Sequence, residues 1–92
     1  MLFRSQPHPD CDELIFCNER GELAEGARSN IFIRSGDVWL TPPLDAGLLP
    51  GVLRAQMIGE GRAREAVLTP RDLAGEVWLG NSLRGLIRGV RL

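Results

Sequence analysis

The chain has 92 residues, which suffice for one domain with a single modest hydrophobic core. Hydrophobic residues make up 43% of it and charged residues 25%, values that are typical of a soluble globular protein rather than a disordered or fibrous one. The formal net charge is −1 and the 11 basic residues, all of them arginine, are scattered singly, so the sequence lacks the basic patch of a nucleic-acid-binding protein.

The sequence also lacks the signals of a membrane protein. No apolar stretch approaches the roughly 18 residues that a membrane-spanning helix needs, and the first residues lack the apolar core of a signal peptide. We therefore expect a cytoplasmic protein with neither a membrane nor a nucleic acid as its partner.

Residues 1–12 contain prolines and polar turn formers without periodicity, so we expect an N-terminal arm that leads into a domain formed by residues 13–92. Cys11 and Cys17 lie on a segment that alternates like a strand. The rise of a strand would place them about 20 Å apart on one face, which excludes a disulfide between them.

A metal site near these cysteines is not favoured. His8, Asp10 and Asp12 lie close by in the sequence, but the spacing matches no standard zinc pattern. We expect reduced thiols and no bound metal.

The first half of the domain reads as strands. Residues 13–18 form a short apolar run bounded by polar residues, which is consistent with a buried strand. Residues 25–30 are polar and small, whereas residues 31–33 are strongly strand-forming. A tight turn at residues 35–37 leads into residues 38–41, which predicts a hairpin.

The second half mixes helices with strands. After a loop, Pro50 and Gly51 open a helix with apolar residues at helical spacing, which should end near residues 59–61. Residues 64–68 read as a strand. Thr69 and the proline after it then predict the start of a short helix that ends at about Ala74.

The last segments complete a mixed α/β sheet. Residues 76–79 read as a buried strand, residues 80–82 as a turn and residues 83–92 as a final strand. The expected order is therefore β, β, β, α, β, α, β, β.

Two segments have the chemistry of a ligand site. The start of the helix at residues 49–53 would present backbone N–H groups and the positive end of the helix dipole to an anion. Residues 80–82 follow a buried strand, at the kind of position where α/β proteins place ligands. Taken singly, each of these segments more often only connects two elements.

Glu25 is a lone acid among small residues, directly before a strong strand. If it were buried it would need a cationic partner, which Arg28 could supply. The alternative is a solvated acid in a turn.

Together these segments resemble the C-terminal half of the class IV pyridoxal-phosphate enzymes, the family of branched-chain and D-amino-acid aminotransferases and aminodeoxychorismate lyase. The resemblance covers residues 12–92. It rests on four strings, which are Asn-Glu-Arg-Gly-Glu-Leu-Ala-Glu-Gly-Ala-Arg-Ser-Asn-Ile-Phe at 18–32, Leu-Thr-Pro-Pro at 40–43, Gly-Leu-Leu-Pro-Gly-Val-Leu-Arg at 47–54 and Trp-Leu-Gly-Asn-Ser at 78–82.

These amino-acid strings are most similar to those of the lyase domain that is sometimes fused to the chorismate-aminating subunit in p-aminobenzoate synthesis, a step of folate biosynthesis. The implied fold is an α/β mixed sheet, the large domain of the class IV aminotransferase-like fold in truncated form.

The resemblance implies a role for each residue of a cofactor site. Glu25 would sit against the pyridine nitrogen of pyridoxal 5′-phosphate and keep it protonated. The other expected positions are Arg28, Ser29 and Asn30 at the edge of the ring, Leu49 on its face, the backbone N–H groups of Val52 and Leu53 together with Asn81 at the phosphate, and Ser82 near the substrate carboxylate.

The sequence departs from the family in two ways. Aminotransferase relatives commonly carry a hydroxyl residue where Leu53 stands, so one phosphate hydrogen bond is missing, although lyase-like members tolerate apolar residues there. The family's Schiff-base lysine would lie upstream of Met1, and the chain contains no lysine at all. Arginine cannot replace it because its guanidinium stays protonated.

These departures imply that the chain has no catalytic residue of its own, is inactive alone, and binds the cofactor weakly or not at all. Its expected partner is a second copy, in a homo-oligomer, or a missing lysine-bearing domain. The alternatives are a fragment of a branched-chain or D-amino-acid aminotransferase, a complementing subunit, and a non-catalytic oligomerisation module.

Overall fold

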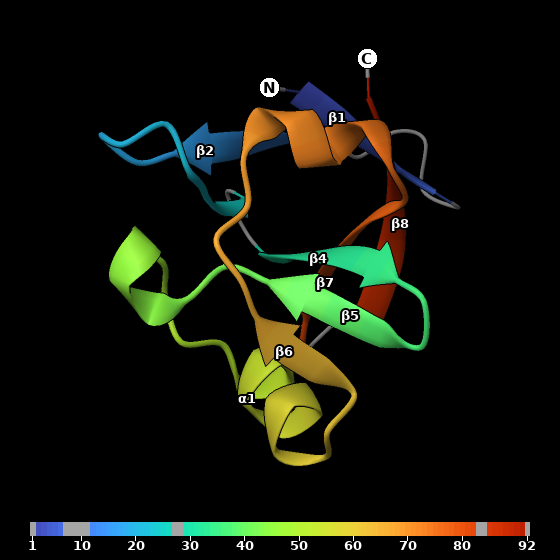
Figure 1. Cartoon of the computed structure of the whole chain (residues 1–92). Helices are drawn as coiled ribbons and strands as arrows, with labels where there is room; N and C mark the ends of the chain where they lie inside the picture. Colours follow the sequence, from blue (N-terminus) through green and yellow to red (C-terminus); the bar gives the residue numbers. More distant parts are fainter. Residues whose placement is uncertain (1, 7–11, 27–28, 83–84, 92) are drawn as a thin grey trace.

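The computed structural model describes residues 2–6, 12–26, 29–82 and 85–91. Within these residues the chain forms one curved eight-stranded sheet with one α-helix and two 3-10 helices (Figure 1). The elements are β1 (Leu2–Gln6), β2 (Asp12–Cys17), β3 (Leu23–Gly26), β4 (Asn30–Ser35), β5 (Val38–Thr41), the 3-10 helix η1 (Leu44–Ala46), α1 (Val52–Gly59), β6 (Ala63–Glu65), the 3-10 helix η2 (Pro70–Ala74), β7 (Val77–Asn81) and β8 (Gly85–Arg91).

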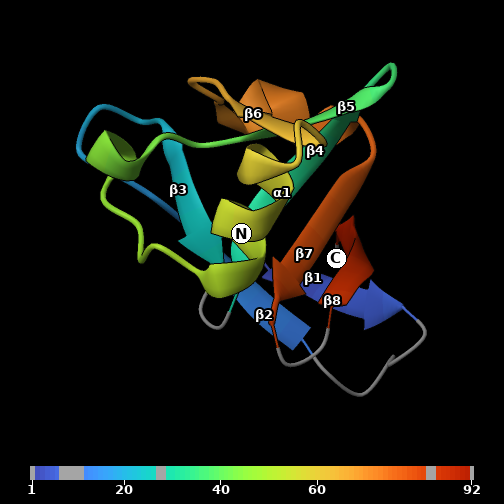
Figure 2. The same ribbon diagram turned by 90° about the horizontal axis from the view of Figure 1, so that it is seen from below.

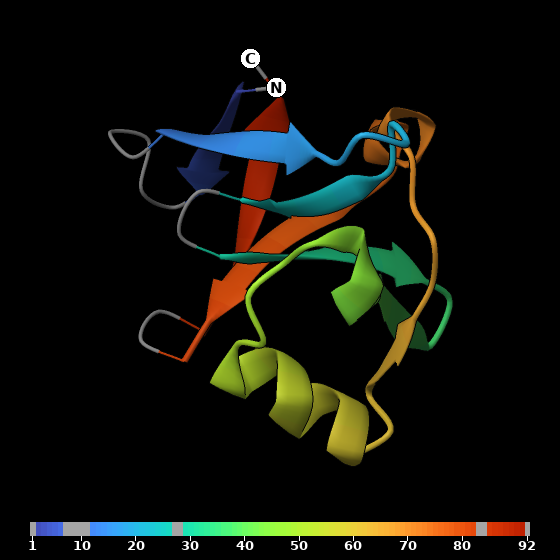
Figure 3. The same cartoon turned by 90° about the vertical axis from the view of Figure 1, so that its left-hand side faces the viewer.

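The sheet order is β3-β2-β1-β8-β7-β4-β5-β6, and all the neighbouring pairs are antiparallel except β5 and β6. The sheet curls, so that β3 at one edge comes to lie near β4 (Figure 3). The predicted mixed α/β architecture is confirmed.

Several predicted elements are confirmed. The hairpin consists of β4 and β5, with Ser35 paired to Val38. The predicted helix is α1, and the predicted short helix is η2, whose Thr69 and Asp72 form a capping box. The predicted strands at 64–68, 76–79 and 83–92 correspond to β6, β7 and β8 with shifted ends.

The order of elements differs from the expectation because two strands and the 3-10 helix η1 were missed. The prediction of an N-terminal arm over residues 1–12 is wrong for Leu2–Gln6, because these residues form β1 between β2 and β8. The pairing with β8 joins residues at opposite ends of the chain, so local sequence carries little sign of it. The second missed strand is Leu23–Gly26, whose last two residues belong to the segment 25–30 that is polar and small.

The interpretation of residues 13–18 as a buried strand is corrected in part. β2 occupies this segment, but Leu14 and Phe16 are 49% and 48% exposed while Ile15 is buried. Since successive side chains of a strand point to opposite faces, only one face of β2 is covered.

Two hydrophobic clusters flank β4. Ile31 and Ile33 belong to the larger cluster, and Phe32, which points the other way, belongs to the cluster beneath α1. The buried members of the larger cluster are Ile15, Leu23, Ile31, Ile33, Leu68, Leu73, Val77 and Leu79. Side chains of β4 therefore contribute to both clusters, the larger one on one face of the strand and the one beneath α1 on the other.

In the part of the chain that the structure describes, α1 and the 3-10 helices fall short of the length and apolarity that a membrane crossing requires. No group of three or more His, Cys, Asp or Glu among the described residues is placed to hold a metal ion. Cys17 is exposed and free, whereas Cys11, His8 and Asp10 lie outside the described residues.

Candidate functional site

A pocket of about 200 Å³ lies where β3, β4 and β7 meet the loop before α1. Figure 2 shows the carboxyl ends of β3 and β7 beside the start of α1. The lining residues are Glu25, Gly26, Ser29, Asn30, Leu49, Gly51 and Asn81. The volume is below the roughly 300–1,000 Å³ of typical ligand pockets.

Glu25 lies on β3 opposite Phe16 of β2 and is half-buried. Its Oε1 accepts a hydrogen bond from the backbone N–H of Leu49 at 3.0 Å. Among the described residues its hydrogen bond is the one to Leu49, which leaves its second oxygen to accept a hydrogen bond from a ligand. The acid is therefore part of a pocket wall rather than a solvated turn.

Asn30 is the first residue of β4 and is 5% exposed. Its Nδ2 donates to the backbone oxygen of Leu49 at 3.1 Å, and the N–H of Gly51 donates to the same oxygen at 2.9 Å. The backbone N–H and the backbone carbonyl of Leu49 are therefore both hydrogen-bonded, whereas its side chain is 74% exposed beside the pocket. This arrangement fixes an apolar side chain at the rim.

The backbone N–H groups at the start of α1 are placed to bind an anion. Gly51 is the N-cap residue and provides no side-chain cap, so the first N–H groups of the helix, at Val52 and Leu53, have no intrahelical partners. Those groups carry the positive end of the helix dipole. They follow directly after Gly51, which lines the pocket.

Gly80 allows α1 to lie close to β7. A Cβ there would be 3.0 Å from Leu53 Cδ2 and 2.9 Å from Leu86 Cδ2, closer than ordinary contacts. The absence of a side chain at Gly80 therefore brings the first turn of α1 against the sheet, next to Asn81.

Arg54 anchors α1 from inside. The side chain is 4% exposed, its Nη2 donates to the backbone oxygen of Pro42 at 3.0 Å, and it pairs with Glu65 of β6. No role is predicted for Arg54 from the sequence. The available signal was its position three residues before Met57, on the face of the helix that is buried.

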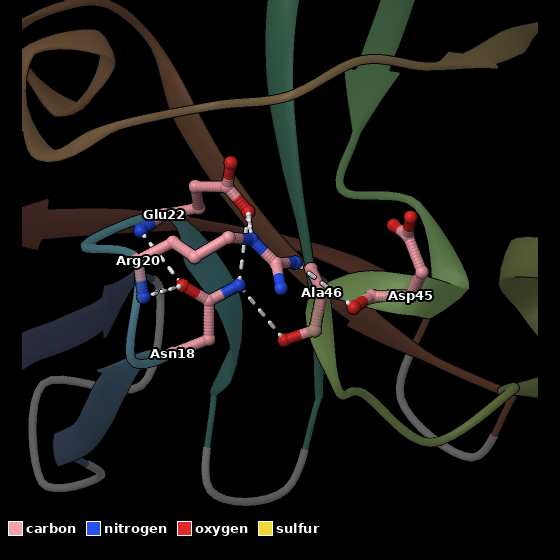
Figure 4. A network of polar contacts seen from close by, with 5 residues as sticks. All are labelled: Asn18, Arg20, Glu22, Asp45 and Ala46. Carbon is pink, nitrogen blue, oxygen red and sulfur yellow. Dashed lines mark hydrogen bonds and ion pairs between the residues drawn. The ribbon is translucent and has the colours of Figure 1, made fainter.

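A second polar network joins the turn between β2 and β3 to η1 (Figure 4). Asn18 Nδ2 donates to Glu22 Oε1 at 3.0 Å and to the backbone oxygen of Ala46 at 3.2 Å. Arg20 donates to Glu22 Oε1 at 2.9 Å and to the backbone oxygen of Asp45 at 3.1 Å. We call these contacts the turn clasp. They hold the segment that leads to Leu49.

Within the turn clasp, the side chain of Asn18 and then that of Arg20 donate hydrogen bonds to Glu22, which hold the pKa of its carboxyl below the ordinary value of 4.5. The charged form of Glu22 is therefore the one that the folded chain favours.

The structure brings five of the predicted site residues to one pocket, namely Glu25, Ser29, Asn30, Leu49 and Asn81. Val52 and Leu53 follow the pocket residue Gly51 but do not line the pocket themselves. Ser82 is exposed in the turn after β7 and is outside the lining. Arg28 lies outside the described residues.

Two lining residues, Gly26 and Gly51, had no predicted role of their own, although Gly51 lies within the candidate anion-binding segment 49–53. Both lie inside recognised motifs, but a glycine offers no side chain from which a role could be inferred. In chemical terms the pocket combines a carboxylate, side-chain amides and an open helix start. It suits a ligand that has a cationic group at one point and an anionic group at another.

The sequence model of the family amino-transferase class IV matches residues 8–92. Among curated proteins, an aminodeoxychorismate lyase from Bacillus subtilis (strain 168) is 43% identical over 86 residues, covering 82% of this chain and 28% of that protein.

Solved structures agree with these matches. A candidate amino-acid aminotransferase from Mesorhizobium loti is 51% identical with a TM-score of 0.79, covering 83% of this chain and 38% of that one. A candidate 4-amino-4-deoxychorismate lyase from Legionella pneumophila is 30% identical with a TM-score of 0.76, covering 84% of this chain and 31% of that one. The chain thus spans between 28% and 38% of the length of these relatives.

Proposed function

This chain belongs to the amino-transferase class IV family of pyridoxal-phosphate-dependent enzymes, and from that premise we propose that its pocket holds the ring and the phosphate of pyridoxal 5′-phosphate for a lyase of the aminodeoxychorismate type. The observation that carries the proposal is the meeting of Glu25, Asn81 and the start of α1 at one pocket.

The acidic side of the pocket fits the ring. Glu25 Oε1 accepts a hydrogen bond from the N–H of Leu49, and its other oxygen would accept a hydrogen bond from the protonated pyridine nitrogen. The side chain of Leu49 stands exposed at the pocket rim, where it would cover one face of the ring. When bound, the cofactor would act as the electron sink for carbanion chemistry at the substrate.

The helix start fits the phosphate. The N–H groups of Val52 and Leu53 lack intrahelical partners, and an anion placed there benefits from the helix dipole. Asn81, at the end of β7, lines the same pocket and would add a side-chain donor. The small volume of the pocket is consistent with walls that come from outside these 92 residues.

The chain does not supply the covalent partner of the cofactor. It contains no lysine, and an arginine stays protonated, so the reactive amine must come from outside residues 1–92. We therefore propose that these residues alone turn over no substrate. A lysine-bearing segment in the same polypeptide or in a separate subunit would complete the site.

The lyase assignment is supported by the 43% identity to the Bacillus subtilis aminodeoxychorismate lyase and by the apolar Leu53, where aminotransferase relatives are expected to carry a hydroxyl residue. The 51% identity to the Mesorhizobium loti protein supports the alternative, an amino-acid aminotransferase. The complete enzyme distinguishes the two. A lyase forms p-aminobenzoate from aminodeoxychorismate without a keto-acid acceptor, whereas an aminotransferase requires that acceptor.

Equilibrium titration tests the cofactor site. Pyridoxine 5′-phosphate is a suitable probe because it has an alcohol in place of the aldehyde and cannot react with amines. We expect weak but saturable binding to the chain and markedly weaker binding of pyridoxine, which lacks the phosphate. If neither compound binds saturably, the cofactor-site proposal is wrong and a non-catalytic oligomerisation module is favoured.

Copurification from the native source tests the completing partner. A separate lysine-bearing subunit predicts a stoichiometric second polypeptide, whereas a single longer polypeptide predicts none and a higher mass for the protein that carries this sequence. Sedimentation of the purified species tests the expected homo-oligomer.

A further inference from the structure

We infer that Asn30 and Gly51 act as an interlocked pair that positions Leu49 and the start of α1, so that Asn30 is a positioning residue rather than a ligand of the ring. The inference rests on the proposed cofactor site and specifies how this chain would hold that site in shape.

The first observation is the state of the Asn30 side chain. It is 5% exposed, and its Nδ2 donates to the backbone oxygen of Leu49, nineteen residues away in the sequence. One of the two N–H groups of this amide is therefore engaged inside the protein. A buried amide that holds a loop in this way contributes by fixing the backbone it touches.

The second observation is the close approach of Gly51. A Cβ at residue 51 would lie 2.2 Å from Asn30 Oδ1, far inside the closest contact that real atoms make. The backbone of Gly51, with φ −66° and ψ 150°, lies in a region that any residue can adopt. The requirement for glycine therefore comes from the Asn30 side chain and not from the backbone conformation.

These two contacts hold both sides of one short segment. The amide nitrogen of Asn30 fixes the carbonyl of Leu49, and its oxygen occupies the space that a Cβ would need at Gly51, the N-cap residue of α1. The position of the first N–H groups of α1 thus depends on Asn30. Losing the pair should weaken phosphate binding more than binding of the unphosphorylated ring.

The test is a double-mutant cycle with Asn30→Ala, Gly51→Ala and the two combined. The probes are pyridoxine 5′-phosphate and pyridoxine, titrated into the 92-residue chain, with thermal unfolding measured for every variant. Gly59→Ala is the control, because a Cβ at residue 59, in the last turn of α1, meets nothing within 4 Å.

We expect Asn30→Ala to weaken pyridoxine 5′-phosphate about tenfold, as for the loss of one hydrogen bond. Gly51→Ala in the wild-type background should weaken it at least as much. The same change in the Asn30→Ala background should have less than about a threefold effect, because the obstructing oxygen is gone. An alanine is a poorer N-cap than glycine, but that cost is common to both backgrounds and cancels in the cycle.

Equal effects of Gly51→Ala in the two backgrounds would overturn the interlock. Parallel losses for pyridoxine 5′-phosphate and pyridoxine would overturn the positioning role at the phosphate. If Gly51→Ala does not fold, the double variant must recover the fold, and its failure to do so also overturns the interlock. Failure of the wild-type chain to bind pyridoxine 5′-phosphate overturns the proposed function instead.

Discussion

The backbone N–H of Leu49 donates a hydrogen bond to Glu25 Oε1 at 3.0 Å, so the acid proposed to meet the pyridine nitrogen also holds the residue proposed to cover the ring. The two functions use different oxygens of one carboxylate. They can therefore be separated by substitutions that remove the charge with and without the hydrogen-bond acceptor.

Glu25→Gln should keep the acceptor for Leu49 but lose the negative charge. We expect little change in thermal stability and a loss of about tenfold or more in affinity for pyridoxine 5′-phosphate, since a hydrogen bond to a charged group contributes about 1.5–3 kcal/mol. Glu25→Ala should also lower stability, because the N–H of Leu49 loses its partner. Unchanged affinity in Glu25→Gln would remove this residue from the site.

Replacing the buried Arg54 tests the anchor of α1. Arg54→Ala removes the donor to the Pro42 carbonyl and the ion pair with Glu65, which is 46% exposed. We expect the free energy of unfolding to fall by about 2 kcal/mol, measured by urea denaturation. The exposed Arg64→Ala on β6 is the matched control and should change it by less than about 0.5 kcal/mol. Equal effects of the two changes would contradict the anchoring role.

The turn clasp predicts a dependence of stability on acid pH. The folded-state pKa of Glu22 is lowered below 4.5, first by Asn18 and then by Arg20, so its contribution is fully present above pH 4.5 and is lost as the pH falls through the lower folded-state value. Wild type and Glu22→Gln should therefore differ in stability at pH 7 and converge in acid. Urea denaturation across this range, with Glu19→Gln as the exposed control, provides the measurement. A difference that grows in acid would contradict the prediction.

Gly80→Ala tests the close packing of α1 on β7. The added Cβ would lie 3.0 Å from Leu53 Cδ2 and 2.9 Å from Leu86 Cδ2, and we expect a destabilisation of about 1 kcal/mol from overpacking. Combining it with Leu53→Ala should give less than the sum of the two single effects. Gly75→Ala, whose Cβ would make only an ordinary contact at 3.7 Å, is the control in thermal unfolding. Strict additivity would show that the first turn of α1 does not press on Gly80.

The sequence could predict the elements whose signals are local. The β4–β5 hairpin follows from a turn between two strand-forming runs, and α1 follows from apolar spacing after Pro50 and Gly51. The strands β1 and β3 could not be predicted in the same way, since their hydrogen bonds depend on partners elsewhere in the sheet. Pairing of this kind is set by tertiary context rather than by propensity.

The candidate site also combines features with local sequence signals and features that depend on tertiary contacts. Five of the seven residues that line the pocket could be named from motifs, but the hydrogen bond that links Asn30 to Leu49 spans nineteen residues and appears only in the folded chain. The buried position of Arg54 was also hidden, because a charged residue in a short helix is usually exposed. Sequence motifs therefore identified which residues gather, and the structure showed which of them position the others.

The most direct test of the cofactor site is a titration of the isotope-labelled chain with pyridoxine 5′-phosphate, followed by the backbone amide signals in NMR spectra. We expect saturable shifts concentrated at Glu25, Leu49, Gly51, Val52 and Asn81, with much smaller shifts when pyridoxine replaces pyridoxine 5′-phosphate. Saturable shifts confined to strands away from this pocket, such as β5 and β6, or no saturable shifts at all, would contradict it.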